Sequence, residues 1–229
     1  MYDEGHLYVS LDVKIKNDKK ETHLMTDNYA IATDRARELF LSYDQESIIK
    51  KFSLRADDRY IYFAFLGKDM AIERSSGAVV DAHSGARQGF NVSLTVYDMF
   101  CHSSHLAEMP KISGEWISLS SMGVHGQGKL SSGMLTNRQL SGFVGKTEQV
   151  KNACESIGGT EKPGGGDASY LLPLFDFFWI WLKYYDADED FPPSITVMWD
   201  TNTLEFMHYE TLFYAFSEIM HTLEKLCGI

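Results

Sequence analysis

Residues 169–200 read SYLLPLFDFFWIWLKYYDADEDFPPSITVMWD, and this stretch decides the fold class. It contains three runs, SYLLPLFD, FFWIWLKYY and SITVMWD, that are rich in the β-branched and aromatic residues typical of strands. The polar turn DADEDFPPS separates the last two runs. We therefore predict three strands of a largely antiparallel sheet. The first can only be an edge strand, because Pro173 has no backbone N–H to donate to a neighbour.

The chain before this stretch adds further strands and helices. HLYVSLDVKI alternates like a half-buried strand, RYIYFAFLG and DMAIERSSGAVV meet at residues 67–69 as a hairpin, and GEWISLSS is extended. Apolar residues at helical spacing predict helices in THLMTDNYAIATDRARELFLSY, DQESIIKKF, NVSLTVYDMFCHSSHLAEM and from about Lys146 to Ile157. We expect Thr26 or Asp27 to be the N-cap of the first of these helices.

The last segment, TLEFMHYETLFYAFSEIMHTLEKL, carries one apolar stripe along its length. This pattern predicts a C-terminal helix packed on the sheet. Strands grouped in runs, with helices between and after them, favour an α+β fold over an alternating parallel α/β fold. We predict one α+β domain over residues 1–229, a largely antiparallel sheet covered by helices.

Composition and charge exclude several classes of partner. The formal net charge is -11, and the basic residues cluster only as the pairs Lys19-Lys20 and Lys50-Lys51. Binding to nucleic acid or to an anionic membrane surface needs clustered cations, so we expect neither partner. Three cysteines without C-x-x-C spacing leave no disulfide framework and no four-cysteine metal site. With no secretory signal and no long apolar span, we expect a cytoplasmic protein.

Residues 123–133, GVHGQGKLSSG, come within one residue of a phosphate-binding P-loop. That loop needs Ser or Thr after its lysine, because the hydroxyl ligates magnesium. Here the residue after the lysine is Leu130, and Ser131-Ser132-Gly133 is a poor helix start. We predict a mobile glycine-rich connector and no nucleotide site.

Three further groups of residues could carry chemistry. Asp98, His102 and His105 fall at i, i+4 and i+7 of a predicted helix, so they could chelate a metal or form the solvated face of the helix. Asp188, Glu189 and Asp190 could hold magnesium or calcium, or form a solvated turn. His208 and Glu210 place a base beside an acid near a predicted helix start, where Glu210 could also complement the helix dipole.

The second half also contains a series of longer phrases. GEWIS, GFVGKTEQVKNACESIGG, GGGDASY, DEDFPPSI and VMWDTNTLEFMHYET follow one another, and together they resemble an uncharacterised family of anaerobic bacteria and archaea, the domain of unknown function number 3786. DNYAIATDRARELF is similar to the opening helix of that family. The resemblance runs from about Asp27 to Leu223, so residues 1–25 are expected to form a strand and loop outside it.

The resemblance implies no named activity. Some relatives carry an additional cysteine-rich iron–sulfur segment, which implies a role near anaerobic redox or corrinoid metabolism. This chain has too few cysteines to supply such a cluster, and we predict no cofactor.

We expect an accessory module that binds a small molecule or a protein partner. Glycines let a ligand approach the backbone, and tryptophan and carboxylates offer stacking and polar anchors. The candidate pocket combines Trp116, Gly165, Gly166, Asp167, Asp200, His208 and Glu210 with the acidic turn.

The alternative is a metal-dependent hydrolase or transferase, with Asp167 or residues 188–190 as ligands and His208 or Glu210 as base. A third possibility is a homodimer built on FDFFWIWLKYY.

Overall fold

One antiparallel sheet organises the protein. The computed structural model describes residues 19–122 and 137–229, and in these ranges nine strands join into one sheet with the central order β4-β3-β2-β7-β8-β9-β5, while β1 pairs with β2 and β6 pairs with β7. Every strand pair is antiparallel. The strands are β1 Arg55–Ala56, β2 Tyr60–Phe65, β3 Lys68–Glu73, β4 Val79–Asp81, β5 Trp116–Ser118, β6 Thr160–Glu161, β7 Ala168–Phe175, β8 Phe178–Tyr185 and β9 Ser194–Asp200.

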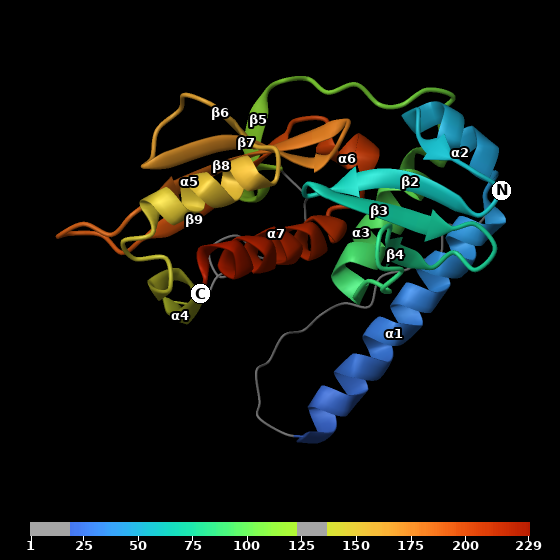
Figure 1. Ribbon diagram of the computed structural model, residues 1–229, viewed down its shortest axis with the longest axis horizontal. Coiled ribbons are helices and arrows are strands. Elements are labelled where there is room, and N and C mark those ends of the chain that lie inside the picture. The colour runs from blue at the N-terminus through green and yellow to red at the C-terminus, as the bar shows by residue number, and fades with distance from the viewer. Residues whose placement is uncertain (1–18, 123–136) are drawn as a thin grey trace.

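Helices α3 and α7 lie side by side along the sheet (Figure 1). Helix α3 lies against α7 and α1, and α5 lies against α7 and β7. No helix in the described ranges is long and apolar enough to cross a membrane. The helices are α1 Lys19–Ser42, α2 Gln45–Phe52, α3 Phe90–Cys101, α4 Asn137–Ser141, α5 Thr147–Ser156, α6 Thr203–Phe206 and α7 Thr211–Cys227, with 3₁₀ helices η1 His102–His105 and η2 Leu119–Ser121. The prediction of an α+β fold with a C-terminal helix is confirmed.

Alternation along β8 shows where the core lies. Phe178, Ile180, Leu182 and Tyr184 are fully buried, whereas the residues between them are partly exposed. Successive side chains of a strand point to opposite faces, so one face of β8 carries the core. The apolar stripe of α7 joins the same hydrophobic cluster through Leu212, Phe216, Ile219 and Leu223.

Pro173 lies inside the sheet, so the prediction of an edge strand for β7 is wrong. Strand β7 pairs with β8 along one side. On its other side, β6 pairs with residues 170–171 and β2 pairs at Phe175. Pro173 falls between these two partners, where it opposes only Trp179 of β8 and precedes a break in the register. Neither β6 nor β2 pairs with Pro173. No neighbouring strand therefore needs a hydrogen bond from its backbone nitrogen, and a central strand tolerates proline at this position.

Two predicted helix boundaries are also wrong. Helix α1 begins at Lys19 rather than at Thr26 or Asp27, so residues 19–25 are helical. The predicted continuous C-terminal helix is broken between Phe206 and Thr211. The backbone N–H of His208 donates to the Asp98 carboxylate at 2.7 Å rather than to a helical carbonyl, which accounts for the break. The predicted strand HLYVSLDVKI lies outside the described residues.

Replacing Phe40 with Ala tests whether α1 is an integral part of the domain. Phe40 is fully buried, and its ring centroid lies 5.9 Å from that of Tyr97 on α3. We expect Phe40→Ala to lower the free energy of unfolding by about 3–5 kcal/mol. Leu39→Ala is the matched control, because Leu39 is 40% exposed, and we expect a loss below about 1 kcal/mol. Equal, small losses in urea denaturation would show that α1 is not docked.

Candidate functional site

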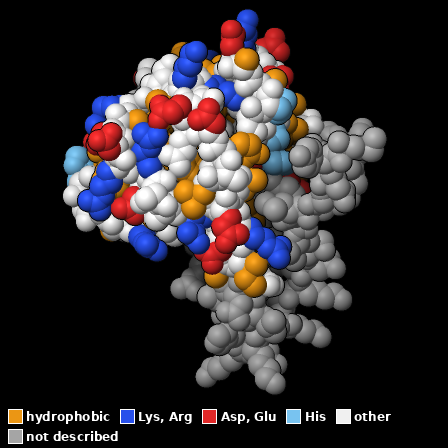
Figure 2. Space-filling model, turned by 90° about the vertical axis from the view of Figure 1, so that its right-hand side faces the viewer, with side chains coloured by type: hydrophobic (Ala, Val, Ile, Leu, Met, Phe, Trp, Pro, Cys, Tyr) orange, Lys and Arg blue, Asp and Glu red, His pale blue; other side chains and the backbone are white. Residues whose placement is uncertain are grey.

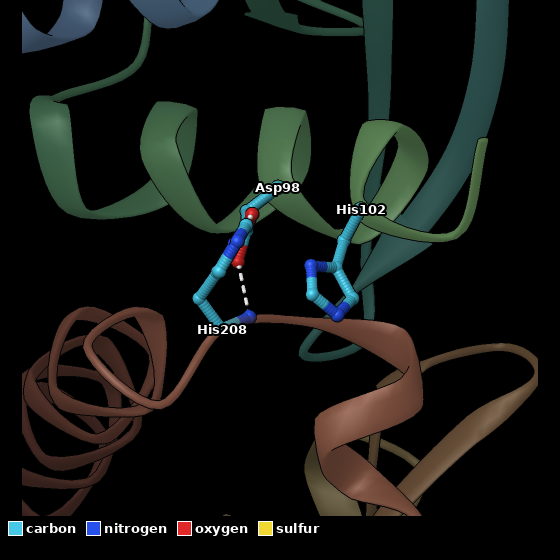
Figure 3. Close-up of side chains that lie close together, drawn as sticks. All are labelled: Asp98, His102 and His208. Carbon is cyan, nitrogen blue, oxygen red and sulfur yellow. Dashed lines mark hydrogen bonds and ion pairs between the residues drawn. The ribbon is translucent and has the colours of Figure 1, made fainter. Parts of the chain in front are cut away.

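Asp98, His102 and His208 come together where α3 meets the break between α6 and α7 (Figure 3). Each side chain offers one metal-ligand atom, and these atoms all lie within 4.8 Å of one another. In the described part of the chain this is the one such group of three or more His, Cys, Asp or Glu side chains. Asp98 and His102 share a face because they are four residues apart at the end of α3.

Asp98 fixes the position of His208. Its Oδ2 atom accepts hydrogen bonds from the backbone N–H of His208 and from the hydroxyl of Thr211. Its Oδ1 atom lies 2.6 Å from Nδ1 of His208. Because a carboxylate only accepts, Nδ1 carries the proton, and a neutral His208 ring has its lone pair on Nε2. The side chain of Asp98 is 14% exposed and that of His208 is 42% exposed.

His102 is held from its other side. Its Nε2 atom lies 2.9 Å from the carbonyl oxygen of Leu204, which can only accept, so Nε2 donates and Nδ1 has the lone pair. Figure 3 shows one ring nitrogen of His102 facing Asp98 and His208. The two imidazoles meet edge to face, with ring centroids 4.1 Å apart. Burial, and then the neighbouring His208, lower the pKa of His102 and favour its neutral form.

His105 does not join this group, although its spacing predicted a shared helical face. Helix α3 ends at Cys101, and Ser103 within η1 departs from helical dihedral angles. This change of direction leaves His105 exposed, and His208 supplies the third side chain from a distant part of the sequence. Histidine side chains gather at one margin of the face shown in Figure 2, where hydrophobic side chains border them.

Asp200, from the predicted pocket, is a structural carboxylate. It is fully buried at the end of β9, opposite Trp116 of β5. Its oxygens accept hydrogen bonds from the backbone N–H groups of Ser113, Gly114 and Asn202 and from the Ser113 hydroxyl. A buried carboxylate needs such partners, and these hold the loop before β5 against the end of β9.

The glycine-rich loop of the predicted pocket packs tightly on β8. A Cβ atom on Gly164 would lie 1.9 Å from the Trp181 ring, and one on Gly166 would lie 2.6 Å from the carbonyl oxygen of Tyr184. Gly165 and Gly166 both have positive φ. Asp167 accepts a hydrogen bond from the backbone N–H of Asp186 at 2.7 Å. Close packing and backbone conformation thus account for these glycines without a ligand.

The remaining predicted residues lie elsewhere. Asp188, Glu189 and Asp190 are exposed in the turn between β8 and β9, and Asp188 Oδ1 accepts the backbone N–H groups of Asp190 and Phe191. Glu210 occupies the N-cap position of α7, but its side chain makes no capping hydrogen bond. Metal binding by residues 188–190 stays a prediction. The P-loop-like residues 123–133 lie outside the described residues.

The cysteines do not contribute a nucleophile in this structure. Cys101, Cys154 and Cys227 are all buried. Burial raises the pKa of the Cys101 and Cys154 thiols to about 12, so the reactive thiolate is scarce at neutral pH. The chemistry available at the candidate site is therefore that of imidazole and carboxylate.

Comparison with known proteins identifies one family. The family described as Domain of unknown function (DUF3786) matches residues 44–222, well over half of the chain. The match includes all nine strands, Asp98, His102 and His208, and it begins after the end of α1. The resemblance of residues 27–43 stays a prediction. No curated protein and no solved structure matches the chain.

Gly166→Ala tests the packing explanation for the glycine-rich loop. The new Cβ atom would meet the backbone of Tyr184, and φ at Gly166 is +94°. We expect about 1–2 kcal/mol of destabilisation from the left-handed backbone and about 1–3 kcal/mol more from overpacking. Gly85→Ala is the control, because φ there is +71° but the space is open. Thermal denaturation should show the larger loss for Gly166→Ala; equal losses would contradict close packing.

The pH dependence of stability tests the burial of His102. Because its folded pKa lies below the ordinary value of 6.5, the unfolded chain binds a proton at this ring where the folded protein does not. The free energy of unfolding should therefore fall as the pH drops below about 6.5. His102→Gln should flatten this dependence in denaturation curves between about pH 5 and 7.5. His105→Gln, which removes an exposed ring, should leave it steep; an identical slope in all three proteins would refute the interpretation.

Proposed function

The chain belongs to the family of the domain of unknown function DUF3786, and we propose that this protein binds one divalent transition-metal ion at Asp98, His102 and His208. The observation that carries the proposal is the anchoring of both imidazoles. His102 Nε2 lies 2.9 Å from the Leu204 carbonyl oxygen, and His208 Nδ1 lies 2.6 Å from Asp98 Oδ1. Metal-ligating histidines almost always donate their other ring N–H to a carbonyl or carboxylate in this way.

The ligands then follow from the protonation of each ring. His102 ligates through Nδ1 and His208 through Nε2, and Asp98 orients His208. One ligand atom from each of the three side chains lies within 4.8 Å of the others, so the carboxylate belongs to the same group as the two imidazoles. Two imidazoles and one carboxylate suit Zn²⁺, Fe²⁺ and neighbouring first-row ions better than Ca²⁺ or Mg²⁺. This proposed site is distinct from the acidic turn at residues 188–190, where metal binding stays a prediction.

The exposure of the site favours chemistry over a purely structural ion. Structural zinc sites are closed by four protein ligands, whereas catalytic sites have three and keep a position for water or substrate. Here two imidazoles supply ligands, Asp98 orients one of them, and the His208 side chain is 42% exposed, so the described side chains do not close the site. We therefore assign the protein to metal-dependent hydrolysis or group transfer, in which a metal held by the two imidazoles would activate water or polarise a substrate.

A second candidate function uses the same residues without a metal. The 2.6 Å contact between Asp98 and His208 is the arrangement in which a carboxylate orients an imidazole for general base catalysis. In this alternative, Nε2 of His208 accepts a proton from the substrate and His102 has no direct role. The metal proposal therefore requires His102 as a ligand, whereas the general-base alternative does not require it.

The cellular setting is part of the proposal. The sequence predicts a cytoplasmic accessory module in anaerobic metabolism that binds a small molecule or a protein partner, with a homodimer as a further possibility. On β8, half of the aromatic run predicted to form that dimer is buried in the core. Only the opposite face, with Trp179, Trp181 and Lys183 partly exposed, is available to a second copy.

Metal titration tests the main proposal. We expect chelator-treated protein to bind about one equivalent of Zn²⁺ or Co²⁺ in calorimetry, with stability gained by about 2.7 kcal/mol at a free metal concentration of 100 Kd. Bound Co²⁺ should give visible absorption bands typical of nitrogen and oxygen ligands. His102→Ala and His208→Ala should abolish binding, and Asp98→Asn should weaken it about 10–100-fold.

The exposed histidines provide matched controls. His83→Ala and His105→Ala should bind metal like the wild type, because both rings lie outside the group of three. Absence of stoichiometric binding by the wild type, or full binding by His102→Ala, would reject the metal site. If His208→Gln but not His102→Gln then abolished a metal-independent hydrolysis, the general-base alternative would replace it.

A further inference from the structure

A groove of about 580 Å³ lies between α4 and the β8–β9 connection. Leu140 and Val144 line one wall, and residues 187–193 line the other. The groove is at the end of the molecule where α4 and this connection meet, away from α3 and α6 (Figure 1). It is therefore separate from the group of Asp98, His102 and His208, and the two proposals stand or fall independently.

Two exposed apolar side chains line the groove. Phe191 is 69% exposed, the largest value for a large hydrophobic residue in the described ranges, and Val144 is 52% exposed. Pro192 and Pro193 extend the apolar wall beside Phe191. Together with Leu140, these side chains give the groove an apolar lining beside the acidic residues 188–190.

Hydrogen bonds beside the groove join the two chain segments that carry its walls. The carboxylate of Asp186 accepts the backbone N–H of Gly145 at 2.8 Å and the hydroxyl of Thr147 at 2.9 Å. Within the connection, Asp188 Oδ1 accepts the N–H groups of Asp190 and Phe191, and the N–H of Asp188 donates to the carbonyl of Phe191. A partner thus meets a preformed groove and does not have to order it on binding.

The acidic side chains at the edge of the groove, which we call the acidic rim, indicate the class of partner that it binds. Asp188, Glu189 and Asp190 line the groove next to Phe191, and the residues that line it include no lysine or arginine. We propose that the groove docks a short segment of a partner protein in which a large apolar side chain is flanked by Lys or Arg. The apolar side chain packs against Phe191 and Val144, and the flanking cations pair with the acidic rim.

Labelled peptides test this proposal by fluorescence anisotropy in physiological salt. The probe is the octapeptide GKRFLRKG, and the comparison peptides are GKRAARKG and GEEFLEEG. We expect saturable binding of the first peptide only. Phe191→Ser, and separately the triple variant Asp188→Asn, Glu189→Gln, Asp190→Asn, should each weaken binding at least tenfold. The side-chain amide introduced by Asp188→Asn retains an oxygen that accepts the hydrogen bonds of the turn, and thermal denaturation checks that both variants fold.

The control separates docking from general attraction to an acidic protein. The variant Glu38→Gln, Glu108→Gln, Glu115→Gln removes the same charge from exposed positions elsewhere and should bind the probe like the wild type. The proposal is overturned if this control weakens binding as much as the rim variant, or if Phe191→Ser has no effect. It is also overturned if no saturable binding is found up to about 1 mM. Self-association that Phe191→Ser abolishes would replace the partner by a second copy of the chain.

Discussion

The carboxylate of Asp98 is the constraint on which the α6–α7 junction and the candidate site depend. It is largely buried, with 14% of the side chain exposed, so its acceptor positions must be filled by donors. The donors come from His208 and Thr211, 110 and 113 residues further along the chain. Filling them breaks the helix between Phe206 and Thr211 and turns the His208 ring toward His102. One desolvated side chain thus determines both a feature of the fold and the geometry of the candidate site.

The rest of the fold makes this arrangement rigid. Helices α3 and α7 pack against each other and contribute to the same core as β7, β8 and β9. Asp98 lies on the packed helix α3 and therefore holds its position, and its hydrogen bonds fix His208 in the break between α6 and α7. Asp200 differs from Asp98 in its partners. It is fully buried and accepts hydrogen bonds from backbone N–H groups and a hydroxyl. Asp200 closes a loop, whereas Asp98 orients a titratable ring that reaches the surface.

Periodicity predicted most of the elements, because burial on one face leaves a repeat of two residues in strands and 3.6 in helices. It failed where a local rule was overridden by a distant neighbour. Pro173 lies in a central strand because β6 and β2 leave a gap beside it. Gly164 and Gly166 resemble a ligand-binding loop in sequence, but Trp181 and Tyr184 occupy the space that they leave. The local sequence around Pro173 and around the glycines does not identify these neighbours.

The α+β class, the antiparallel strands of the second half and the shared helical face of Asp98 and His102 can all be predicted from the sequence. These properties depend on residues that are close in the chain, so spacing is enough to predict them. The sequence also offers His208, but in a different candidate pocket, and its helical spacing predicts His105 beside Asp98 and His102. The histidine that completes the group is set by contacts between segments that are far apart in the chain. The third histidine depends on where η1 departs from helical geometry and on which distant groups donate hydrogen bonds to Asp98. Neither can be predicted from the spacing of residues along the chain.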